Sequence, residues 1–219
     1  MNQQPLNPEL RVRVLDEARR TRSPTRFAAT TRAGVALFTA LIVSIGLFVQ
    51  VGGVRVGPRP LALIVGTALG SSLIALCATW TAISRAGSML GRPRLFLLLA
   101  AIATPVVLFV WKIYYSALFL GMSERWPTRP GLKCFGLTLG TALLPLIALA
   151  FERRRTDPTH PKALGAALGG AVGTWAAVMV DLWCPVAYPP HVVLGHVLPI
   201  LILVLIGAWL GKVVIAIRG

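Results

Sequence analysis

A chain of 219 residues that is 56% apolar and only 13% charged carries about half the charge expected of a soluble domain. Its mean hydropathy is +0.75 and its apolar residues come in long blocks, which indicates lipid as the surrounding solvent. The formal net charge of +15 is spread in short clusters between those blocks. That distribution is typical of membrane topology and argues against direct nucleic-acid binding.

Residues 1–32 form the longest polar stretch, which is too short for a core of its own and predicts a basic arm. Asn7-Pro8-Glu9 is a helix start, and Ser23-Pro24 ends the helical pattern. The arm therefore reads as one amphipathic helix. Three interpretations stay open: an arm that is solvated or lies on lipid headgroups, a helix bound in the groove of a cytoplasmic protein, and a topology signal without a partner. The apolar anchors for a groove would be Leu10, Val14, Leu15 and Ala18.

Six apolar stretches are long enough to cross roughly 30 Å of hydrocarbon, which takes about 20 residues. The sequence therefore predicts an all-α polytopic membrane protein, in which residues 33–219 form a bundle of six transmembrane helices. Lys112 lies near the end of the third stretch, where its side chain is expected to extend to the headgroups. The expected spans are residues 33–54, 61–84, 95–120, 134–151, 163–180 and 192–211.

Glycines recur at four-residue spacing in several spans, a pattern that lets helix backbones approach closely. The longest such stripe is in the fifth span, which is therefore expected to lie centrally. Gly165, Gly169 and Gly173 are the packing candidates there. Shorter stripes occur at Gly66 and Gly70, at Gly136 and Gly140, and at Gly207 and Gly211.

Lys and Arg residues lie mainly on one side of this predicted bundle. With the N-terminus in the cytoplasm, the inner segments hold 16 of them, seven in residues 1–32 alone, and the outer segments hold 6. Cytoplasmic loops of membrane proteins carry such an excess. The even number of spans then places both termini in the cytoplasm.

Cysteine and histidine gather at the outer ends of the last three predicted spans. Cys134 opens the fourth span, Cys184 follows the fifth, and His191 and His196 bracket the start of the sixth. The nearby Asp181 is costly in lipid and is expected to face the protein interior or the interface. The four Cys and His residues are compatible with unpaired structural roles, with a disulfide or redox pair of the two cysteines, or with a Zn²⁺ site. On a regular helix, five residues turn through about 140°, so His191 and His196 would share a site only if His191 preceded the regular turns.

Enzyme signatures are missing from the sequence. It holds no metalloprotease, nucleophile-elbow, phosphate-binding-loop or dinucleotide-binding motif. A small transporter or channel is one class of membrane protein to consider. Such a protein needs polar groups along an intramembrane path, and only Lys112 and Asp181 approach that requirement.

Two parts of the chain carry a family resemblance. One is KCFG at 133–136, which opens a span that ends in ERRR at 152–155. The other is DLWCP at 181–185, followed by His191 and His196. With the short basic arm, these segments resemble the six-helix membrane anti-sigma factors typified by NrsF, and among them the light-responsive carotenogenesis regulators of the CarR type.

The resemblance implies a protein of the bacterial inner membrane whose arm holds an extracytoplasmic-function (ECF) sigma factor away from RNA polymerase. It implies release of that sigma factor on a signal, which would be light acting through singlet oxygen in a CarR-like protein, and it leaves room for an additional membrane partner in release. Cys134, Cys184, His191 and His196 would be the sensing candidates. A hypothesis for binding is that a basic face of the arm covers an acidic surface of the sigma factor, using Arg11, Arg13, Arg19 and Arg20.

Overall fold

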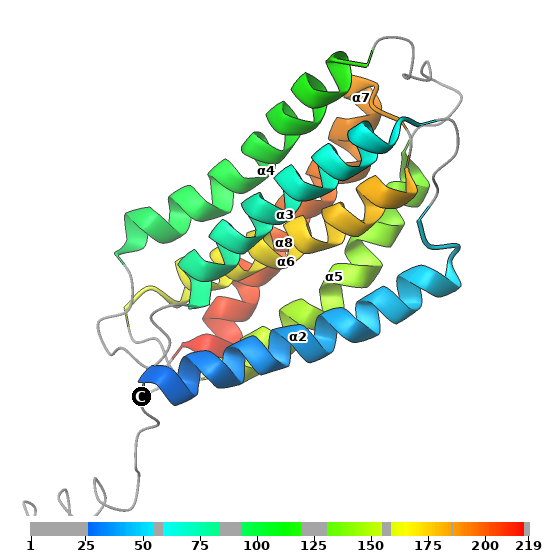
Figure 1. The fold of residues 1–219 in the computed structure, drawn as a ribbon. Helices are drawn as coiled ribbons and strands as arrows, with labels where there is room; N and C mark the ends of the chain where they lie inside the picture. Colours follow the sequence, from blue (N-terminus) through cyan, green and yellow to red (C-terminus); the bar gives the residue numbers. More distant parts are fainter. Residues whose placement is uncertain are drawn as a thin grey trace, which may run out of the picture.

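The computed structural model describes residues 26–54, 59–83, 93–119, 131–154, 159–184 and 186–216. Within these ranges the chain is all-α, and six helices are long and apolar enough to cross a membrane (Figure 1). The predicted fold class is therefore confirmed. The arm residues proposed as contacts, from Leu10 to Arg20, lie outside the described residues.

The helices keep the expected order. The first five spans are α2 (Arg26–Gln50), α3 (Leu61–Ile83), α4 (Arg94–Ala117), α5 (Leu132–Glu152) and α6 (Pro161–Trp183). The sixth is continuous but irregular, with α7 (Pro189–Val192), a π-helical turn η1 (Val193–Val197), α8 (Leu198–Leu210) and a second π-helical turn η2 (Gly211–Ile215). The helix α2 begins seven residues before the expected position 33, because the uncharged residues between Arg26 and Arg32 continue the helix.

The centre of the bundle is α6, as its glycine pattern predicts. In its most apolar 18-residue window 94% of residues are buried, against 28–44% in the other spans. Small side chains make this possible, since Ala and Gly dominate α6 and let α3, α4, α5 and α8 pack around it. Leu146, Leu168 and Leu203 join α5, α6 and α8 in the largest core cluster.

Backbone contact between α6 and α8 depends on glycine. A Cβ atom at Gly165 would collide with the backbone of Gly207, and one at Gly169 would collide with the carbonyl of Leu203. One at Gly173 would lie only 3.0 Å from Ile200 Cγ2. Atoms of α8 therefore occupy the space that a side chain would need at each of these three glycines.

Glycines four residues apart do not mark a close helix contact in every span. A Cβ atom at Gly136 or Gly140 would meet nothing within 4 Å, so the expectation of a helix contact is wrong for this pair. Gly66 and Gly70 face large aromatic side chains of α4, which fill the space that a Cβ would need.

The helix α2 is the most peripheral, and within the described residues it packs almost entirely against α5 (Figure 1). Two polar contacts fix this pairing. Ser44 Oγ donates a hydrogen bond to the carbonyl of Thr141 over 2.7 Å, and Arg32 Nε lies 2.7 Å from Glu152 Oε1. The start of α2 is thereby held against the end of α5.

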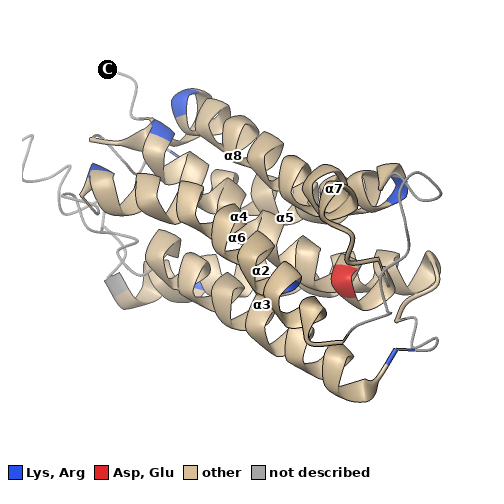
Figure 2. Ribbon diagram, turned by 90° about the horizontal axis from the view of Figure 1, so that it is seen from above, with Lys and Arg blue, Asp and Glu red and all other residues tan. Residues whose placement is uncertain are grey.

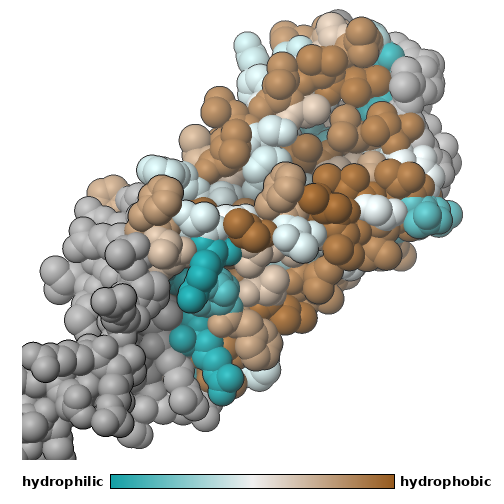
Figure 3. Space-filling view, turned by 60° about the horizontal axis from the view of Figure 1, so that its bottom comes forward, coloured by the Kyte–Doolittle hydropathy of each residue, from teal (hydrophilic) through white to brown (hydrophobic). Residues whose placement is uncertain are grey.

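Apolar side chains cover the outside of the bundle. Large residues such as Phe38, Leu69 and Trp209 are exposed around it, and Figure 3 shows a broad hydrophobic surface bounded by a hydrophilic patch beside the undescribed segment. Lys and Arg gather towards the ends of the bundle (Figure 2). Lipid is the solvent that suits such a surface, and the chain is a multi-pass membrane protein.

Candidate functional site

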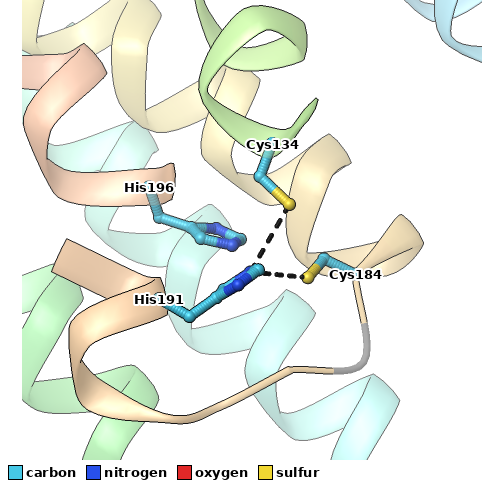
Figure 4. Close-up of side chains that lie close together, drawn as sticks. All are labelled: Cys134, Cys184, His191 and His196. Atoms are coloured by element: carbon cyan, nitrogen blue, oxygen red, sulfur yellow. Dashed lines mark hydrogen bonds between the residues drawn. The ribbon is translucent and has the colours of Figure 1, made fainter. Parts of the chain in front are cut away.

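Four cysteine and histidine side chains meet at one end of the bundle. Cys134 lies in the first turn of α5, Cys184 directly follows α6, His191 belongs to α7, and His196 belongs to η1. Their side chains converge (Figure 4), and their ligand atoms all lie within 4.8 Å of one another. All four residues are buried, with exposed fractions between 0 and 4%. We call these residues the thiol–imidazole cluster, and the end of the bundle that holds them the cysteine end.

A π-helical turn explains why both histidines reach the cluster. Sequence reasoning placed residues five apart about 140° from each other on a regular helix. The chain between the two histidines runs through η1, whose hydrogen-bond register is i→i+5, and this wider turn brings residues five apart closer to the same face. The ring centroids of His191 and His196 are 5.7 Å apart as a result.

Glycine lets this turn approach α5. A Cβ atom at Gly195 would lie 3.0 Å from Cys134 Cβ and 3.0 Å from the carbonyl oxygen of Gly131. Gly131 itself has a φ of 90°, the left-handed conformation that glycine adopts without strain. These two glycines bring the start of α5 against η1 and thereby set Cys134 beside the histidines.

His191 bridges the two sulfur atoms. Its Nε2 atom lies 3.1 Å from Cys184 Sγ and 3.5 Å from Cys134 Sγ. Hydrogen bonds from the Cys134 thiol and from His191 lower the pKa of Cys184 against the opposing effect of burial. Thiolate is the form of cysteine that binds metals and reacts with oxidants, and this shift favours it at Cys184.

A buried carboxylate, that of Asp181, contacts the His196 ring of the cluster. Asp181 on α6 forms an ion pair with Lys112 on α4, accepts a 3.3 Å hydrogen bond from Ser71 on α3, and lies 2.9 Å from His196 Nδ1. The expectation that Asp181 faces the interior is confirmed. The expectation that Lys112 extends to the headgroups is wrong, because the residue is only 4% exposed and its ammonium group pairs with Asp181 instead.

This pairing also bears on the transporter alternative. Lys112 and Asp181 were the two charges that approached an intramembrane path, and they neutralise each other at the cysteine end. Their role in the described structure is to join α4 to α6.

Arg59 belongs to the site, although the sequence showed it only as one of the six basic residues on the outer side. Its guanidinium lies just before α3 and donates to the carbonyl oxygens of Asp181 over 3.0 Å and Leu182 over 2.8 Å. It thus caps the end of α6, where carbonyls have no partner within the helix and a cation is favourable. A weaker 3.4 Å contact reaches the carbonyl of Cys184. The cap fixes the backbone from which Cys184 projects, and only the tertiary fold brings residue 59 to it.

The chemistry available here is that of soft ligands. Cys134 and Cys184 are both free thiols, and each lies close to imidazole nitrogen. Two thiols and two imidazoles suit a borderline or soft metal ion, and the two sulfurs also suit oxidation to a disulfide. Cys77, the third cysteine, is exposed on α3 and belongs to no cluster of the described residues.

A bundle of six apolar spans with α6 buried at its centre, and a thiol–imidazole cluster at one end, defines a multi-pass membrane protein with a built polar site. The family model of NrsF, described as negative regulator of sigma F, matches residues 15–216. The chain belongs to this family, and a sigma factor is therefore its implied partner. No curated protein and no solved structure matches the chain.

Proposed function

We propose that this protein is a membrane-bound anti-sigma factor that sequesters an ECF sigma factor through its N-terminal arm, residues 1–32, and releases it on a signal. The observation that carries the proposal is the family match over residues 15–216 of a chain whose described part is a membrane bundle. A soluble partner needs a polar surface to bind. The arm is the longest polar stretch that the sequence offers for this purpose.

The chemistry of the arm suits a protein groove. Leu10 and Val14 are four residues apart and would share one helical face, with Leu15 and Ala18 extending it. Arginines flank this face, and the acidic surface that a sigma factor presents to RNA polymerase would attract them.

A route for the signal runs along α5. This helix begins beside Cys134 in the thiol–imidazole cluster, and its last residue, Glu152, pairs with Arg32 of α2. Since α2 directly continues the arm and packs on α5, a change at the cluster would reach the root of the arm through these two helices. We propose the cluster as the sensing site. Thiolates and imidazoles are oxidisable, which suits the light and singlet-oxygen signal of CarR-like proteins.

Substitutions on the two faces of the arm test this function. Leu10→Asp and Val14→Asp, singly and together, should abolish co-purification of the sigma factor encoded beside this chain and activate a reporter that depends on it, because a charge replaces an apolar anchor. The matched control is Val12→Asp, which introduces the same charge about 200° around the helix from Leu10. The control should keep the reporter repressed, and all variants should reach the membrane in equal amounts.

Two results would contradict the proposal. Continued repression by the Leu10→Asp/Val14→Asp variant would show that the arm is not the inhibitor. Equal activation by Val12→Asp would show that added negative charge, rather than the loss of an apolar face, is responsible.

A further inference from the structure

The ligand atoms of the thiol–imidazole cluster have the separations of a tetrahedral metal site. In such a site Zn–S is about 2.3 Å and Zn–N about 2.0–2.1 Å, which puts the ligand atoms roughly 3.3–3.8 Å from one another. Here His191 Nε2 lies 3.1 and 3.5 Å from the two sulfurs, and all four ligand atoms fall within 4.8 Å. Small side-chain adjustments would close them around one ion.

The carboxylate of Asp181 sets His196 in the form that binds a metal. Its Oδ1 atom lies 2.9 Å from His196 Nδ1, so that nitrogen donates to the carboxylate and Nε2 is the ring atom left to bind a metal. Lys112 Nζ lies 3.2 Å from Nδ1 and 3.4 Å from Nε2. An atom almost equally distant from both ring nitrogens is not aligned with the lone pair of either. A carboxylate behind a histidine is a common arrangement at metal sites, where it fixes the ring and raises its basicity.

Charge balance in the apolar interior favours a divalent cation. Asp181 and Lys112 already form a neutral pair. Two thiolates would leave two uncompensated negative charges in a buried place, which is strongly unfavourable. A divalent cation bound by two thiolates and two neutral imidazoles is neutral as a whole.

A disulfide between Cys134 and Cys184 would explain fewer features of the cluster than a metal site does. It would use the two cysteines alone and would not explain why two imidazoles converge on the same point as the sulfurs. It would also give no reason for the hydrogen bond that Asp181 receives from His196.

We propose that Cys134, Cys184, His191 and His196 form a closed tetrahedral site for Zn²⁺, with Asp181 as the positioning residue behind His196. Four protein ligands leave no open coordination position for water or a substrate, so the ion would hold the cluster together rather than catalyse a reaction. It fastens the start of α5, the end of α6 and the start of the last span to one another.

Metal binding by the full-length protein in detergent tests the site directly. The protein should carry a tag without histidine, be kept reduced, and be stripped with a chelator before titration with Co²⁺. We expect one equivalent to bind, with the visible absorption of tetrahedral cobalt–thiolate coordination, and Zn²⁺ to displace it. Cys134→Ser and Cys184→Ser should each abolish the absorption. The matched control Cys77→Ser, which changes an exposed cysteine, should leave it intact.

Two further variants separate a ligand role from a general loss of folding. His191→Cys should keep cobalt bound and raise the sulfur-to-metal charge-transfer absorption about 1.5-fold, since three thiolates would then coordinate in a Cys₃His site. Asp181→Asn should weaken binding by about 10- to 100-fold, as loss of an outer-shell partner does, without changing the tetrahedral spectrum.

The proposal is overturned if the reduced protein binds no cobalt, if the spectrum is octahedral, if Cys77→Ser loses binding as the other cysteine variants do, or if His191→Cys leaves the charge-transfer absorption unchanged. Isolation of a Cys134–Cys184 disulfide that excludes metal would overturn it as well. These measurements involve no sigma factor, so their failure and the failure of the anti-sigma function are distinguishable.

Discussion

The side chain of Asp181 connects α6 to three other spans. Its carboxylate on α6 is bonded to Lys112 on α4, Ser71 on α3 and His196 in η1. Each of these partners lies on a different span. A carboxylate inside a membrane bundle is costly unless it is paired and hydrogen-bonded, and here every oxygen has a partner.

Breaking the Lys112–Asp181 pair should destabilise the bundle strongly. Lys112→Met leaves a buried carboxylate without its cation, which typically costs about 3–5 kcal/mol. The double variant Lys112→Met/Asp181→Leu removes both charges and should lose much less than the sum of the two single variants. Unfolding of the purified protein in mixed detergent would measure these free energies.

Lys212→Met is the control for the loss of a lysine, because Lys212 is exposed near the end of the last span. It should unfold like the parent protein. If Lys112→Met were no more harmful than Lys212→Met, the pair would have no structural role.

At the level of helices, hydropathy alone predicted the six spans and their order, because a stretch of about 20 apolar residues has few alternatives to crossing the bilayer. Their ends were less predictable. The uncharged residues before Arg32 extend α2, although a basic residue follows them. The glycine stripe of α6 also predicted its central place, since only small side chains allow such close neighbours.

The site was only partly visible in the sequence. Order along the chain placed Cys134, Cys184, His191 and His196 near one end, but their convergence depends on the π-helical turn η1, which local propensity does not reveal. The burial of Lys112 depends on Asp181, which lies on another span. The cap by Arg59 likewise arises only in the folded bundle. Tertiary partners decide these features, and a single sequence does not name them.

The α6–α8 contact should be sensitive to any side chain larger than hydrogen. Gly169→Val would place its side chain against the carbonyl of Leu203, and overpacking of this kind costs about 1–3 kcal/mol or more. Gly140→Val makes the same change where a Cβ meets nothing within 4 Å, so its effect should be far smaller. Thermal unfolding in detergent would compare the two variants. Equal loss of stability would mean that the glycine contact does not hold α6 against α8.

At the scale of the whole molecule, the two ends of the bundle have different chemistry. The cysteine end holds the buried cluster, and the opposite end holds the Arg32–Glu152 pair beside the root of the arm. The helix α5 reaches from one end to the other. A sensor at one end and an inhibitor at the other would therefore lie on opposite sides of the membrane, connected through the bundle.

The excess of Lys and Arg at one end predicts which end of the bundle faces the cytoplasm. With 16 of the 22 basic residues on the inner side of the proposed topology, the arm should lie in the cytoplasm and the cysteine end outside. Alkaline phosphatase, which is active only after export, should be active when fused after residue 54 and inactive when fused after residue 84. A fluorescent protein that matures only in the cytoplasm should give the opposite pattern at both positions, and it should fluoresce when fused to either terminus. An exported N-terminal reporter would remove the arm from any sigma factor, because sigma factors act in the cytoplasm, and it would overturn the proposed function together with the topology.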